Sequence, residues 1–177
     1  MQKSRQIGIF INQLLNILWS IACFTPIVMY WLDHGAEKWL YAFLFLSVVI
    51  AFMPKTFFNK LKLFGSKISY ENWGVKTFRK FVQEGNHRWA NRTPTKYISN
   101  MLDASRYLNK IAMYERYHWC CLIFFVCTSI HCFVHGEVIY GVIITMANVI
   151  YNVPTLLLQQ YNRLRINALK IKYRLNK

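Results

Sequence analysis

Four apolar stretches divide the chain, and their lengths predict an all-α protein that is embedded in a membrane. They cover residues 7–31, 39–56, 119–134 and 138–160. A helix needs about 20 mainly apolar residues to cross the hydrocarbon core of a bilayer. The second stretch meets Pro54, so it needs the aromatic residues that follow to complete a crossing. The pattern predicts one polytopic membrane domain over residues 1–177 with about four transmembrane helices.

The segment between the second and third stretches, residues 57–118, has a different pattern. Lysines and arginines alternate there with aromatic and aliphatic residues, which is typical of helices that lie along an anionic membrane surface. From about Thr95 the apolar positions follow a helical period. We expect an amphipathic helix that leads into the third span without a break. Residues 161–177 form a basic tail.

Composition agrees with a membrane protein. Hydrophobic residues make up 55% of the 177 residues, more apolar surface than one small water-soluble core can bury. The net charge of +15 would suit a nucleic-acid-binding protein. Zinc-finger spacing and the aromatic RNP signature are absent from the sequence, which argues against that class.

The distribution of basic residues predicts the orientation. Thirteen Lys and Arg fall in residues 55–116 and six in residues 163–177, whereas the short connections 32–38 and 135–137 hold one Lys and three acidic residues. Basic residues favour the cytoplasmic side. We therefore expect a multi-pass plasma-membrane protein with both termini and the segment 57–118 in the cytoplasm.

Two of the predicted spans contain amides, which need hydrogen-bond partners inside a membrane. The first span holds Asn12, Gln13 and Asn16, and the fourth holds Asn148, Asn152 and Gln159. The fourth-span amides share one helix face. Either they bond to neighbouring helices or they line a substrate groove, and the polar faces could close within one chain or between two copies of a homo-oligomer.

The sequence Glu115-Arg116-Tyr117-His118-Trp119 stands directly before the third span. Glu115 and His118 are spaced i, i+3, so they share a helix face where water, headgroups and hydrocarbon meet. Chemistry at that boundary can join a lipid tail to a polar acceptor. The alternative is a simple helix-surface contact beside an interfacial tryptophan. A diiron centre would need a second such motif, and the sequence holds one.

Several of these motifs together resemble the glycosyl-diaponeurosporenoate acyltransferases, small bacterial membrane enzymes of carotenoid glycolipid synthesis. The resemblance covers roughly residues 64–166. It is carried by Trp73-Gly74-Val75-Lys76, Gly85-Asn86-His87, Glu115-x-x-His118-Trp119, Asn152-Val153-Pro154 and Gln160-Tyr161-Asn162-Arg163-Leu164-Arg165.

The resemblance implies transfer of a fatty acyl group to a hydroxyl of a lipid-linked acceptor, a sugar hydroxyl of a glycolipid above all. Such a reaction needs a base, which His118 can supply because imidazole changes charge near neutral pH, and Glu115 is expected to orient it. Asn152 or Tyr161 is the candidate oxyanion donor. Substrate contacts are expected from Asn148, Asn152, Gln160, Tyr161, Asn162, Arg163, Arg165, Lys76 and His87.

The expected partners are membrane lipid, an acyl donor and a glycolipid or carotenoid-type acceptor at the inner leaflet. The donor, an acyl-CoA or acyl-carrier protein, is a substrate, and we expect neither a resident cofactor nor a metal. The pair His131 and His135 is spaced for chelation, but two ligands complete no site. A second hypothesis remains open, a non-catalytic membrane subunit whose basic segment binds anionic lipid or a partner protein.

Overall fold

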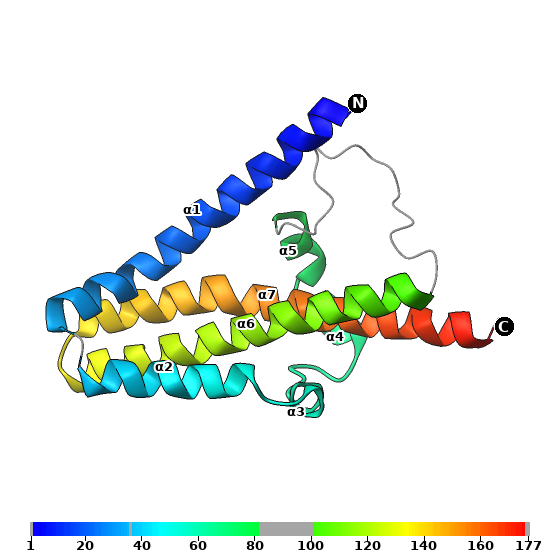
Figure 1. The fold of residues 1–177 in the computed structure, drawn as a ribbon. Helices are drawn as coiled ribbons and strands as arrows, with labels where there is room; N and C mark the ends of the chain where they lie inside the picture. Colours follow the sequence, from blue (N-terminus) through cyan, green and yellow to red (C-terminus); the bar gives the residue numbers. More distant parts are fainter. Residues whose placement is uncertain (1, 36, 82–100, 176–177) are drawn as a thin grey trace.

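The computed structural model describes residues 2–35, 37–81 and 101–175, and every element in these ranges is an α-helix. Figure 1 shows their arrangement. In chain order the helices are α1 Gln2–His34, α2 Lys38–Ala51, α3 Lys55–Lys60, α4 Lys67–Asn72, α5 Val75–Phe81, α6 Met101–Val134 and α7 Val138–Leu175. The predicted all-α class is confirmed.

The antiparallel helices α6 and α7 form the axis of the protein (Figure 1). The expected amphipathic helix does run into the third apolar stretch without a break, because α6 continues from Met101 to Val134. The turn between the two helices follows from Gly136, whose φ of 79° is a conformation that favours glycine. Glu137 N–H donates to Cys132 O at 2.8 Å, and this bond caps the end of α6.

Among the described residues, three helices are long and apolar enough to cross a membrane: the segments Gln13–His34 of α1, Met101–Val134 of α6 and Val138–Ile171 of α7. The element predicted over residues 39–56 is shorter than expected. Helix α2 has 14 residues and rises about 21 Å, less than the roughly 30 Å of a hydrocarbon core. The helix ends because Pro54 has no amide hydrogen and disfavours helical geometry in the residue before it.

Three hydrophobic clusters lie along the α6–α7 axis. The first joins α1, α6 and α7 through Ile27, Tyr30, Trp31, Cys121, Phe125, Cys132 and Ile144, and Leu40 and Phe43 of α2 pack against it. The second fastens α4 and α5 to α7 through Tyr70, Val75, Leu157, Leu158 and Tyr161. The third joins α6 and α7 near the far end through Ala104, Ile111 and Ile166. The short helices therefore rest on the same α7 that enters the membrane.

The two halves of α1 differ in their surroundings. Its C-terminal half contributes Ile27, Tyr30 and Trp31 to the first cluster. Its N-terminal half diverges from α7 (Figure 1), and Leu14, Leu15, Ile17, Leu18 and Trp19 are each about half exposed. In a bilayer such side chains face lipid. Ser20, near the point of divergence, still bonds Tyr151 of α7 at 3.0 Å.

Candidate functional site

A chain of hydrogen bonds crosses from α7 to His118 on α6. Asn148 Nδ2 donates to the backbone oxygen of Leu122 at 3.1 Å. Asn152 Nδ2 donates to Asn148 Oδ1 at 2.8 Å, and Asn152 Oδ1 lies 3.0 Å from His118 Nδ1. Asn148 and Asn152 thus share one face of α7, as their spacing predicted, and that face meets α6.

The direction of these hydrogen bonds fixes which nitrogen of the neutral imidazole carries the hydrogen. A backbone carbonyl can only accept, so Asn148 must turn its NH₂ group toward Leu122 and its oxygen toward Asn152. The same reasoning turns the oxygen of Asn152 toward His118, so Nδ1 must carry the hydrogen. Neutral imidazole has one N–H, which leaves a lone pair on Nε2. Among the described residues, Nε2 of His118 has no hydrogen-bond partner.

Aromatic rings and hydroxyls surround His118, which is 8% exposed. The ring centroids of Tyr117 and Tyr151 lie 5.1 and 5.3 Å from that of the imidazole. The Tyr151 hydroxyl is 3.0 Å from Ser20 Oγ and 3.4 Å from the Tyr117 hydroxyl. An imidazole and several neutral hydroxyl groups therefore lie together, and the sequence interpretation missed the hydroxyl groups.

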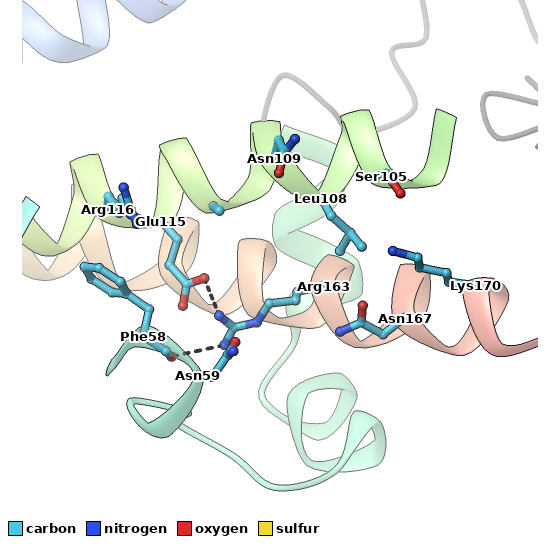
Figure 2. A pocket seen from close by; sticks show the side chains of 11 residues that line it. Phe58, Asn59, Ser105, Leu108, Asn109, Glu115, Arg116, Arg163, Asn167 and Lys170 are labelled. Atoms are coloured by element: carbon cyan, nitrogen blue, oxygen red, sulfur yellow. Dashed lines mark hydrogen bonds and ion pairs between the residues drawn. The ribbon is translucent and has the colours of Figure 1, made fainter. Parts of the chain in front are cut away.

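Glu115 belongs to a separate cluster. Its carboxylate accepts from Gln160 Nε2 at 3.0 Å and from Arg163 Nη1 at 2.8 Å, and the residue is 1% exposed. Arg163 also donates to Phe58 O at 3.4 Å, and Figure 2 shows both contacts. The sequence led us to expect that Glu115 orients His118. In the structure the side chain that bonds the imidazole is Asn152. The physical reason is the register of the helices, which places Asn152 opposite His118.

Gln160 uses its full bonding capacity within the protein. Its oxygen accepts from Leu63 N–H at 2.9 Å and from the Tyr70 hydroxyl at 2.7 Å. Its nitrogen donates to Leu61 O at 2.9 Å and to Glu115. Two acceptor and two donor positions are the whole inventory of an amide side chain. Gln160 thus ties the α3–α4 connection to the helix pair, a role that its sequence position did not reveal.

Tyr161 and Lys76 meet at Glu71, a residue that the sequence interpretation did not single out. The Tyr161 hydroxyl donates to Glu71 Oε1 at 2.8 Å, and Lys76 Nζ lies 2.7 Å from Oε2. The Lys76 ammonium and then the Tyr161 hydroxyl lower the pKa of Glu71, and the same carboxylate raises the pKa of Lys76. Arg165 lies over the Tyr161 ring, 5.6 Å from its centroid.

The remaining candidates are placed as follows. Asn162 is buried in α7 with 6% exposure. His87 lies outside the described residues, so its expected substrate contact stays a prediction. His131 bonds the Tyr30 hydroxyl at 2.6 Å. Within residues 2–35, 37–81 and 101–175, no group of three or more His, Cys, Asp or Glu side chains is placed to hold a metal ion.

Two hollows border α6 beside this cluster. The first has a volume of about 270 Å³ and lies between α3, α6 and α7, where Glu115 and Arg163 form part of its wall (Figure 2). The second, of about 500 Å³, lies next to it against Ala51, Met113 and Cys120. His118 lines neither of them.

Comparison with known proteins gives one match. No curated protein and no solved structure matches the chain significantly. The model of the glycosyl-4,4'-diaponeurosporenoate acyltransferase family matches residues 54–171, a range that runs from the start of α3 into the last turns of α7 and contains both side-chain clusters. The match covers well over half of the chain, which therefore belongs to this family of acyltransferases of carotenoid biosynthesis.

Proposed function

We propose that the chain transfers a fatty acyl group to a sugar hydroxyl of a membrane-embedded glycolipid, with His118 as the general base. Membership of the family supports an acyl donor and a glycolipid or carotenoid acceptor. The proposal adds the ester product, the base and the place of the reaction. Its main support is a buried histidine whose Nδ1 is held by Asn152 at 3.0 Å, so that Nε2 has the free lone pair.

In the proposed reaction, Nε2 of His118 accepts the proton of the acceptor hydroxyl as its oxygen attacks the acyl carbonyl. The C–O bond forms, the tetrahedral intermediate collapses, and the C–S bond of a thioester donor breaks. The imidazolium returns the proton to the departing thiolate, so the products are an ester and a free thiol. Asn152 keeps its bond to Nδ1 throughout, because that nitrogen carries hydrogen in both protonation states.

In this proposal the oxyanion can draw on groups beyond the two donors that the sequence indicated. The Tyr161 hydroxyl is engaged by Glu71, whereas Asn152 Nδ2 donates one of its two hydrogens to Asn148 and keeps the other. The hydroxyls of Tyr117 and Tyr151 belong to rings packed against the imidazole. We assign them the oxyanion role, since neutral donors fixed beside the reacting carbonyl stabilise developing charge.

The proposed site lies at the inner leaflet. His118 stands one residue before the apolar stretch 119–134, and the basic residues of α3 to α5 and of the C-terminal part of α7 favour the cytoplasmic side. Acyl and carotenoid chains would approach from the bilayer beside the half-exposed N-terminal half of α1. A soluble acyl-CoA or acyl-carrier protein can reach that leaflet from the cytoplasm.

The test is acyl transfer by purified protein in vesicles, with a radiolabelled long-chain acyl-CoA and glucosyl carotenoid acid as substrates. We expect His118→Gln to lower kcat/KM about 10²- to 10⁴-fold, the usual contribution of a general base. His131→Gln is the matched control, because His131 is also buried in α6 but bonds Tyr30 near the opposite end of the span. Full transfer by a correctly folded His118→Gln variant would sink the proposal.

A further inference from the structure

The hollow beside Glu115 and Arg163 has an excess of positive charge. Its wall contains three cations, Arg116, Arg163 and Lys170, and one carboxylate, that of Glu115. Arg163 is paired with the carboxylate at 2.8 Å. Arg116 and Lys170 have no ion-pair partner among the described residues. Two uncompensated cations therefore border a cavity of about 270 Å³.

Arg116 is held in place without using its full bonding capacity. Its guanidinium stacks over the Phe58 ring at 5.5 Å, and Phe58 is itself 3% exposed. The Nε atom of Arg116 is buried and bonds no described residue. A buried donor without a partner is costly, which favours an acceptor that arrives with a ligand. The amides of Asn59 and Asn167 at the same wall can add further contacts (Figure 2).

The second hollow adjoins the first. Asn109, Ala112 and Arg116 line both, and beyond them the wall turns to Ala51, Met113 and Cys120. Helix α6 enters its apolar stretch at this level. A polar, cationic hollow thus lies beside a more apolar one at the expected membrane boundary, with Arg116 in the wall of both.

We propose that these hollows bind an acyl-chain amphiphile that carries phosphate, with the phosphate between Arg116, Arg163 and Lys170 and the acyl chain in the second hollow. Guanidinium groups hold phosphate oxygens through paired hydrogen bonds. Two molecules offer this chemistry, a long-chain acyl-CoA and an anionic phospholipid. Binding is independent of His118, and only the identification of the ligand as the acyl donor rests on the proposed function.

The experiment measures binding by the full chain in dodecyl maltoside micelles, which contain no phosphate. The probes are palmitoyl-CoA, dipalmitoyl phosphatidylglycerol and, as the anion without phosphate, palmitic acid. We expect Arg116→Gln and Lys170→Gln each to weaken binding of a phosphate probe about tenfold, as loss of a charge-assisted hydrogen bond does. Arg106→Gln on the same helix and Lys62→Gln on the surface are matched charge controls, and neither residue lines the hollows.

The pattern of losses identifies the source of the phosphate. A selective loss for palmitoyl-CoA indicates a thioester donor, and a selective loss for phosphatidylglycerol indicates a lipid headgroup. Equal affinity in Arg116→Gln, Lys170→Gln and wild type overturns the inference, as does an equal loss in the two control variants. His118→Gln is expected to bind as wild type does, so failure of the proposed base and failure of this site remain separable.

Discussion

Glu115 and His118 lie one helical turn apart on α6, yet they belong to networks with opposite characters. Glu115 is a charged group whose oxygens are engaged by Gln160 and Arg163, and this cluster fastens the α3–α4 connection to the helix pair. His118 is held through Nδ1 by the neutral amide of Asn152 and keeps Nε2 available. One network joins segments of the chain, and the other leaves one imidazole nitrogen without a partner among the described residues.

The register of the antiparallel pair explains this division. Asn148 reaches Leu122 and Asn152 reaches His118, so a step of four residues along α7 matches a step of four backwards along α6. Glu115 lies three residues further back along α6, and its long side chain meets Gln160 and Arg163, which lie eight and eleven residues beyond Asn152 along α7. Spacing of i, i+3 puts two side chains on one face, but the helix opposite decides which groups each of them meets.

The largest expected effect is on stability, from removing the cation that pairs with Glu115. Arg163→Met leaves a carboxylate with 1% exposure without its positive partner, which typically costs about 3–5 kcal/mol. Glu115→Gln should cost less, because Arg163 keeps Phe58 O and borders a cavity. The measurement is unfolding in mixed micelles by titration with sodium dodecyl sulfate.

The double variant Glu115→Gln, Arg163→Met sharpens the contrast. With both charges removed, no buried charge is left unpaired, so the double variant should be more stable than Arg163→Met alone. In vesicles, Glu115→Gln should keep transfer within a few-fold of wild type, since His118 does not depend on it for orientation. If a stable Glu115→Gln protein showed transfer as low as that of His118→Gln, the two networks would not be functionally separate.

Much of the fold could be predicted from the sequence because helical periods and apolar lengths are local properties. The continuous helix into the third span came from such a pattern, and α6 shows it from Met101, since residues 95–100 lie outside the described part of the chain. The fourth stretch, predicted over residues 138–160, is helical as well, but α7 continues through the predicted basic tail to Leu175. The N-terminal element predicted from residue 7 begins at Gln2. The predicted second span, residues 39–56, is longer than helix α2, which ends at Ala51. The apolar residues continue past Pro54, and the pattern alone does not show where the helix ends.

The site was harder to predict because its contacts join distant parts of the chain. His118 and Asn152 were both candidates, but nothing local indicates that they bond, as they are 34 positions apart. Gln160 was interpreted as a substrate ligand, and only the fold brings Leu61 and Leu63 to it. Glu71 escaped notice since an acidic residue in a basic surface helix has no distinctive spacing.

A smaller effect is expected from Asn152→Leu, which removes the acceptor of His118 Nδ1. The imidazole can then carry its hydrogen on either nitrogen, so kcat should fall about 10- to 100-fold with little change in KM, less than the loss in His118→Gln. Nitrogen-15 spectra of histidine-labelled protein report which ring nitrogen is protonated. The His131 signal is an internal control, because its bond to Tyr30 is untouched. An unchanged His118 signal in Asn152→Leu would show that the Asn152 amide does not determine which ring nitrogen carries the hydrogen.

The smallest effect is expected at Glu71, outside both networks and outside the membrane spans. Its pKa is lowered by Lys76 and by the Tyr161 hydroxyl, so the ionised form stabilises the folded state above the ordinary carboxyl pKa, and this contribution is lost as the pH falls through the lowered value. Glu71→Gln should therefore lower the unfolding midpoint slightly at pH 7, and this deficit should shrink as the pH falls through the lowered carboxyl pKa. Lys76→Gln should reproduce this deficit more fully than Lys67→Gln, since Lys76 Nζ lies 2.7 Å and Lys67 Nζ 3.6 Å from the carboxylate. A deficit that persists unchanged at low pH would mean that side-chain packing, and not the charge of Glu71, holds α4 and α5 against α7.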